Sequence, residues 1–358
     1  MKGIGAVLLG GIAIGAVIVS VNTLTGRADT ADGVVSRAEA DQVVAGLLAD
    51  EQTGVASPRV EAAAAKPGWR WDTYTDVQLQ VPDDWAQRLW AGPPDCTEDD
   101  WVPEPTVFRP GGARPASLKV CLKPKPARQV APSVVFGGER PGVVPLAGGW
   151  VRETRKVGKL LVTVTAGDAV LRRQILDSAG VVDTVDSYGC APRADRQVGR
   201  PPANGGLKSV GDIVGVSICR YSIQGMPISP TGSADDLRFA RLQAGSRLTG
   251  GVADHLVRDL IAAPPGAGPT FSDPRTCGPA TGPDRGTEFL ILRVQGSAHA
   301  QDVLYRYDGC RTNGTDDGSA LRQLTADTAR QIFLGVHQLR QYVPALDKLL
   351  IGTPPPVR

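Results

Sequence analysis

The chain has 358 residues, of which 42% are hydrophobic and 21% are charged, so disorder throughout is excluded and two ordinary domains are expected. Its 39 basic and 37 acidic side chains nearly balance, so no overall charge favours a nucleic acid or another strongly charged partner. We therefore expect no nucleic-acid partner.

An apolar segment near the start determines the expected topology. No charged residue occurs within residues 4–26. At about 1.5 Å per residue, a helix of this length can cross a hydrocarbon core of about 30 Å. Lys2 precedes the segment and Asp29 follows it, so the positive-inside rule predicts a cytosolic tail of residues 1–3. The rest of the chain, from residue 27, is then expected outside the cytosol.

A cleaved signal peptide is the alternative interpretation of this segment. Its apolar run is longer than the usual h-region of about 7–15 residues, and no A-x-A cleavage site follows it. We therefore favour an uncleaved anchor. This predicts a single-pass protein of the cell membrane whose carboxyl-terminal bulk is extracytoplasmic.

Residues 27–67 are expected to be a spacer between the membrane and the folded part. They are rich in Ala, Asp, Glu and Gly and contain no aromatic residue. Ser36 and Glu39 have capping-box spacing, which indicates one short helix within the spacer.

The cysteines indicate an oxidising environment. They form an even set without C-x-x-C spacing, which argues against a zinc ribbon or a thioredoxin-like motif. Outside the cytosol such a set is expected to pair, and the most local pattern joins the cysteines in chain order. Other pairings and six free buried thiols remain alternatives. The expected pairs are Cys96 with Cys121, Cys190 with Cys219, and Cys277 with Cys310.

A first globular region is expected over residues 68–187. Apolar and polar residues alternate in Val77–Val81, which predicts a half-buried strand that Pro82 ends. The same alternation in residues 118–122 predicts another strand, with Cys121 on its polar face.

The end of this region predicts a hairpin followed by a helix. Residues 151–155 and 160–165 have strand composition and are joined across Val157-Gly158. Asp168 is then placed to cap a helix, because aspartate is a preferred N-cap residue. The apolar face of that helix would comprise Val170, Leu171, Ile175 and Leu176.

A second globular region, residues 188–343, shows one pattern twice: a cysteine in a loop, a strand, a second cysteine, and a Leu-Thr step into a helix. In the first copy the strand is Val214–Ile218 and the helix begins after Thr249. In the second copy the strands are Glu288–Val294 and Val303–Tyr307, and the helix begins after Thr325 and continues through Val336. Each Thr is expected to be an N-cap. The pattern is explained either by the same local folding rules acting in both halves or by a true duplication.

The resulting fold class is α+β. We expect an N-terminal transmembrane helix and two globular regions in which antiparallel sheets pack against helices and disulfides staple the chain. Residues 344–358 are expected to form a Pro-rich tail.

Three stretches carry a family resemblance: GWRWDTYTDVQLQVPDDW (68–85), VSICRYS (216–222) and YDGCRTNGTDDGS (307–319). They resemble actinobacterial secreted or membrane-anchored envelope proteins of unknown function. The aromatic-rich opening strand and closing helix of the first region are also similar to Mog1/PsbP-like modules. Both resemblances imply a non-enzymatic envelope protein and supply no catalytic residues.

No catalytic, cofactor-binding or metal-binding constellation stands out. His255 and His337 fall on expected helices and His299 in a hairpin turn, without H-E-x-x-H or H-x-H spacing. The chain contains neither G-x-S-x-G nor S-x-x-K, the motifs of a nucleophilic serine. Residues 313–318 imitate the start of a calcium loop, but Leu324 stands where that loop requires glutamate.

Aromatic residues gather at the start of the first region. Such rings either line a groove for a glycan or peptide, or form the core of a sheet-rich module. The candidate binding face comprises Trp69, Trp71, Tyr74, Trp85, Trp90 and Trp101.

The sequence therefore predicts a non-catalytic binding or envelope-assembly module tethered to the membrane, with a protein or glycan partner in the envelope. A hydrolase with acidic catalytic residues is the first alternative, because acidic residues cluster at Asp83-Asp84, residues 98–100 and Asp316-Asp317. An extracytoplasmic sensor or regulator is the second. The sequence does not indicate the oligomeric state.

Overall fold

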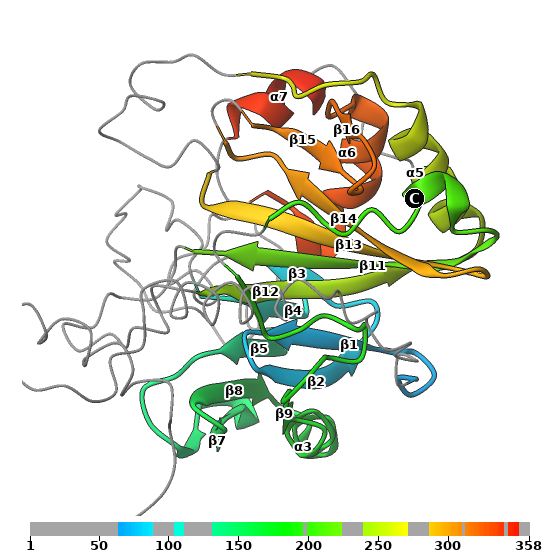
Figure 1. Cartoon of the computed structure of the whole chain (residues 1–358). Helices are drawn as coiled ribbons and strands as arrows, with labels where there is room; N and C mark the ends of the chain where they lie inside the picture. The colour runs from blue at the N-terminus through cyan, green and yellow to red at the C-terminus, as the bar shows by residue number, and fades with distance from the viewer. Residues whose placement is uncertain are drawn as a thin grey trace, which may run out of the picture. The chain divides into compact units, whose positions relative to one another are not determined.

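Figure 1 shows the computed structural model of the chain. It describes residues 64–88, 104–110, 131–195, 199–223, 239–270, 286–309, 312–339 and 343–350. All of these fall within one compact unit, residues 56–358. None of the helices in these ranges is both long and apolar enough to cross a membrane.

Several expectations fall on residues outside these ranges. They are the anchor of residues 4–26, the capping box of the spacer, the strand of residues 118–122, Trp90, Trp101, Cys96, Cys121, Cys277 and Cys310.

The described residues of the first region form two sheets and the α-helix α3. A three-stranded sheet has the order β1-β2-β9, and a six-stranded sheet has the order β3-β4-β5-β8-β7-β6. The elements are β1 (Trp69–Tyr74), β2 (Val77–Pro82), β3 (Ala86–Arg88), β4 (Thr106–Phe108), β5 (Ser133–Phe136), β6 (Gly142–Pro145), the short 3-10 helix η2 (Ala147–Gly149), β7 (Val151–Val157), β8 (Leu160–Ala166), α3 (Ala169–Asp177) and β9 (Gly180–Val181).

Three local predictions for this region are confirmed, whereas Val170, predicted on the apolar face of the helix, is 54% exposed. The strand predicted at Val77–Val81 is β2, and β7 and β8 form the predicted antiparallel hairpin. Asp168 caps α3, because its side chain accepts hydrogen bonds from the backbone N–H groups of Val170 and Leu171 at 2.7 and 3.2 Å. The aspartate thereby satisfies N–H groups that the helix itself cannot.

The prediction of purely antiparallel sheets is wrong for the first region. β3 pairs with β4, and β4 with β5, in the parallel sense. Parallel neighbours require long connections. The chain between β3 and β4 and that between β4 and β5 supply such length, and short strand patterns gave no sign of the direction.

β6 is the exposed edge strand of the six-stranded sheet. All four of its residues are exposed, and Val143 is 63% exposed. Open apolar edges invite pairing with a second chain. Leu146 N–H donates to Trp150 C=O at 2.7 Å next to the β6–β7 ladder. Because hydrogen-bonded pairs alternate in antiparallel ladders, Val143 and Pro145 direct their backbone groups away from β7.

Pro145 therefore protects this edge, because proline has no N–H to offer an incoming strand. We expect Pro145→Thr to promote self-association, with an association constant about tenfold higher, because one net hydrogen bond is worth about 1 kcal/mol. Sedimentation velocity over a concentration series measures this. Adding Val143→Lys to the variant should restore the monomer. Unchanged association of Pro145→Thr would contradict the assignment.

The second region is built on one seven-stranded sheet of order β10-β12-β11-β13-β14-β15-β16, with every pair antiparallel. The elements are β10 (Arg193–Asp195), the 3-10 helix η3 (Leu207–Ser209), β11 (Ile213–Ser222), β12 (Phe239–Leu248), α5 (Gly250–Ala262), β13 (Glu288–Gly296), β14 (Ala300–Arg306), β15 (Gly314–Asp316), β16 (Leu321–Arg322), α6 (Ala326–Ile332), the 3-10 helix η4 (Gly335–His337) and α7 (Pro344–Leu350).

The two faces of this sheet bury different residues. Val216 and Ile218 of β11 belong to the large core beneath α5 and α6, whereas Cys219 and Tyr221 belong to a smaller core on the opposite face. The period of two along the strand produces this division. Figure 1 shows α5, α6 and α7 on one side of the sheet and β1 and β2 on the other, and β1 packs against β12.

The helix predictions for this region hold in part. Thr249 is the N-cap of α5, but its side chain makes no capping bond. Thr325 caps α6 in a reciprocal capping box with Thr328. The predicted continuation through Val336 is wrong, because α6 ends at Ile332 and His337 lies in η4. Gly335 has a φ of 52°, which an α-helix does not accommodate.

The beginning of the predicted Pro-rich tail is a helix. Residues 344–350 form α7, and Leu346 is fully buried in the large core. Proline at the first position of a helix is favourable, because that position makes no intrahelical N–H bond.

Candidate functional site

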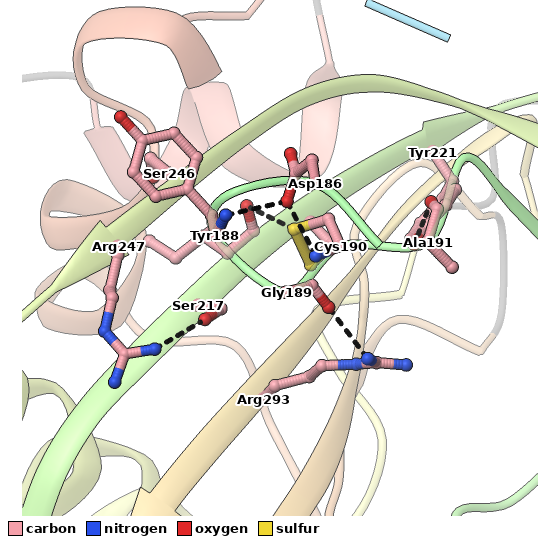
Figure 2. The surroundings of a disulfide bond; sticks show 12 residues. Asp186, Tyr188, Gly189, Cys190, Ala191, Ser217, Tyr221, Ser246, Arg247 and Arg293 are labelled. Atoms are coloured by element: carbon pink, nitrogen blue, oxygen red, sulfur yellow. Dashed lines mark hydrogen bonds between the residues drawn. A yellow bond between two sulfur atoms is a disulfide. The ribbon is translucent and has the colours of Figure 1, made fainter. Parts of the chain in front are cut away.

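The disulfide between Cys190 and Cys219 is the central feature of the contact between the two predicted regions (Figure 2). The pairing is the one predicted, with an S–S distance of 2.02 Å and a Cα–Cα distance of 5.4 Å. Cys219 belongs to β11, and Cys190 lies in the loop that precedes β10. Both side chains are fully buried in the smaller core.

The loop at Cys190, residues 186–191, is called here the disulfide loop, and it is folded around the carboxylate of Asp186 (Figure 2). One carboxylate oxygen, Oδ1, accepts from the backbone N–H groups of Tyr188 at 2.9 Å and Cys190 at 2.8 Å. The backbone N–H of Asp186 donates to the Cys190 carbonyl at 2.8 Å. The aspartate thus fixes the direction in which Cys190 approaches β11.

The second carboxylate oxygen, Oδ2, lies against β12. It is buried, and the carboxylate also interacts with the Thr73 hydroxyl, which favours its charged form. A Cβ atom at Gly245 would lie 2.4 Å from this oxygen, so the strand must carry glycine here. Burial raises the pKa of Asp186, against the lowering effects of the bond from Cys190 N–H and of the Arg293 charge.

The disulfide loop ties β1 and β2 to the seven-stranded sheet. On one side, Ser187 donates from both its N–H and its hydroxyl to Gln78 Oε1, each at 3.0 Å. The Tyr188 hydroxyl donates to the Trp71 carbonyl at 3.0 Å. On the other side, Arg293 donates to the Gly189 carbonyl at 2.8 Å. Because the loop contains residue 187, it also spans the predicted boundary between the two regions.

A second set of polar contacts lies on the opposite face of the seven-stranded sheet. We call it the buried polar cluster: the buried residues Arg220, Glu288, Tyr307 and His337, with half-buried Ser246 beside His337. Arg220 donates to Glu288 Oε2 at 2.5 Å, and the Tyr307 hydroxyl donates to the same oxygen at 2.8 Å. The guanidinium also donates to the His337 and Gln338 carbonyls at 3.2 and 2.7 Å. Arg220 therefore fastens η4 to β11.

The first region contains a second buried pair of an arginine and a carboxylate. Arg109 is fully buried and forms an ion pair with Asp72. Gln87 accepts from Arg109 at 2.6 Å and donates to Asp72 at 2.9 Å. β3, which contains Gln87, packs against η4. The two buried arginines, Arg109 and Arg220, thus each have a carboxylate beside them, as the burial of a charge requires.

The Ser246–His337 distance is that of a nucleophile and its general base. The contact lacks the suitable pKa and the orienting third group that such a pair needs. Ser246 Oγ lies 2.8 Å from His337 Nε2. Burial, with the charges of Arg220 and Arg109, holds the pKa of His337 well below its usual value. A general base works best with a pKa near the working pH, and no group in the described part of the chain orients His337 Nδ1. The pair is therefore a structural contact.

The aromatic candidates are divided between core and surface. Tyr74 and Trp85 are each 5% exposed and belong to the core of the first region. Trp69 packs partly buried against that core, and Trp71 is half-buried on β1. The core interpretation therefore accounts for Tyr74 and Trp85.

The polar side chains of the aspartate- and glycine-rich segment after β14 make hydrogen bonds within the chain. Asp317 Oδ1 accepts from Ser319 and Ala320, and its Oδ2 accepts from the Leu207 N–H at 3.0 Å. Asn313 is fully buried and exchanges hydrogen bonds with the Gly309 backbone. No group of three or more potential metal ligands occurs in the described ranges.

The remaining histidines lie apart from both sets of contacts. His299 is in the turn between β13 and β14, as predicted. His255 is exposed on α5, where it borders an open depression of about 580 Å³ between α5 and α6. Asp259, Asp327 and Arg330 also line this depression.

The residues that organise these contacts were not predictable from the sequence. Asp186 and Gly245 belong to no motif, and buried Arg109 and Arg220 resemble surface arginines in the sequence. The one usable signal was the pair of cysteines. No family model matches the chain, and no curated protein or solved structure is significantly similar to it.

Proposed function

We propose that this chain is an extracytoplasmic protein, held at the cell membrane by residues 4–26, that acts as a non-catalytic binding or envelope-assembly module. The buried Cys190–Cys219 disulfide is the observation that carries the proposal. Disulfides persist mainly in oxidising compartments, and this one joins elements that are central to the fold.

The polar groups of the described residues also support a non-catalytic role. The arginines and carboxylates of the disulfide loop and the buried polar cluster hold backbone or each other, which leaves them little freedom to engage a substrate. The partner we expect is a protein or glycan of the cell envelope.

The compartment can be tested on intact cells that produce the full chain. Cells are treated with a maleimide and then lysed in denaturant, with and without reductant. We expect Cys190 and Cys219 to be alkylated only after reduction, and the folded part to be cleaved by protease added outside the cells. Alkylation of both cysteines without reduction, together with protection from protease, would refute the extracytoplasmic placement.

The non-catalytic role needs a separate test. The purified full chain is incubated with peptidoglycan, glycan and ester substrates, and its retention on isolated envelope material is measured in parallel. We expect retention without turnover. Turnover that one substitution among Asp83, Asp84, Asp316 and Asp317 abolishes would show instead a hydrolase.

A further inference from the structure

His337 lies where η4 meets strands of both predicted regions. η4 packs against β12 of the second region and β3 of the first. The imidazole is 1% exposed, and its Nε2 contacts the Ser246 hydroxyl at 2.8 Å. Its Nδ1 is buried without a hydrogen-bond partner. The Nε2 atom of the ring therefore has one hydrogen-bond partner. Among the described residues, no acceptor is available for an N–H at Nδ1.

The charges around this histidine are already balanced. β11 supplies Arg220, whose partner is Glu288 of β13. The first region supplies Arg109, whose partner is Asp72 of β1. Tyr307 is fully buried and stays neutral because burial raises its pKa. A proton on His337 would add a positive charge near two guanidinium groups, whose carboxylate partners Glu288 and Asp72 are already engaged.

We propose that protonation of His337 releases η4 from β12 and β3, so that acidification opens the contact between the two regions. This inference does not depend on membrane attachment or on the proposed function. The closed state holds the imidazole neutral, whereas the open state exposes it to water. The equilibrium between the two states must therefore respond to pH.

The sign of the response follows from proton binding. The pKa of His337 is held well below its usual value in the closed state by burial, Arg220 and Arg109. In the open state it returns to about 6.5. Below that pH the open state binds the proton and the closed state does not. Opening should therefore rise up to about tenfold for each pH unit, until the closed-state pKa is reached.

Three buried or half-buried carboxyl groups act in the opposite direction. Burial raises the pKa values of Asp186, Asp302 and Asp308. For these carboxyls the folded state binds a proton more readily than the unfolded state, so acidification through their range adds stability. They cannot cause weakening between about pH 6.5 and pH 5.5.

Hydrogen exchange of the full chain tests the proposal. Amides of residues 334–338 are followed at about pH 7.5, 6.5 and 5.5, and the rates are corrected for intrinsic exchange. We expect opening to increase about fivefold between the two lower pH values in the wild type, but not in His337→Gln. The control His255→Gln changes an exposed histidine on α5 and should behave as the wild type. An equal increase in His337→Gln, or none in the wild type, would overturn the proposal.

A second measurement covers the case in which His337→Gln does not fold. The imidazole resonances of the wild type are titrated by NMR. The His337 signal should stay neutral while η4 is closed and should change only together with the η4 amides. Ordinary titration near pH 6.5 with unchanged amide protection would show that the imidazole charges freely inside the fold, which contradicts the proposal.

Discussion

An Arg220→Met variant should lose about 3–5 kcal/mol of unfolding free energy, because it leaves the Glu288 carboxylate buried without the charge of its guanidinium partner. Arg220 is 1% exposed and donates hydrogen bonds to Glu288 and to the carbonyls of His337 and Gln338. Methionine preserves much of the volume but none of these bonds. Urea unfolding of the full chain, followed by circular dichroism, measures the difference.

Two further variants separate the buried charge from the lost packing. Arg220→Met combined with Glu288→Gln removes both charges and should regain part of the loss, which a double-mutant cycle quantifies. The control is Arg330→Met, whose ion pair with Asp327 is exposed and should be worth less than about 1 kcal/mol. Equal losses in Arg220→Met and Arg330→Met would contradict the structural role of the buried pair.

The parts of this fold that follow local rules were predictable from the sequence. The strand ended by Pro82, the β7–β8 hairpin and the Asp168 cap depend on neighbouring residues, and all three predictions are confirmed. The Cys190–Cys219 pair was predictable for a related reason, because these cysteines are only 29 positions apart.

The contacts between distant segments were not predictable. The Asp72–Arg109 pair and the bonds of Ser187 to Gln78 join residues whose sequence neighbours give no sign of each other. Buried arginines also escape sequence reasoning, since most arginines are exposed and burial depends on a partner elsewhere in the chain. The parallel β3–β4–β5 pairing could not be predicted for a similar reason, because strand direction is a property of the whole sheet.

The Asp186–Gly245 contact shows where the missing information lies. The glycine is needed only because a carboxylate from a loop far along the chain approaches β12 at that point. Isolated glycines in strands often mark such close approaches, but the sequence does not say what approaches. The candidate site could therefore be located through its cysteines, whereas its chemistry could not.

Removal of the disulfide by Cys190→Ala with Cys219→Ala should cost about 3–4 kcal/mol, because a crosslink across 29 positions restricts the unfolded chain. The disulfide loop should also be held less firmly in the folded state, since Cys190 is its covalent attachment to β11. Urea unfolding of the oxidised wild type and of the double variant measures the cost. Hydrogen exchange of residues 186–191 should increase in the same variant.

Tyr188→Phe is the matched control, because it removes one hydrogen bond of the same loop and leaves the crosslink intact. That loss should be about 1 kcal/mol. If the alanine pair costs no more than Tyr188→Phe, the noncovalent contacts of the loop, rather than the disulfide, hold the two regions together. If it costs several times more and loosens residues 186–191, the covalent bond is the main restraint. An oxidising compartment would then be a condition for the stability of the folded part, because reduction would remove that restraint.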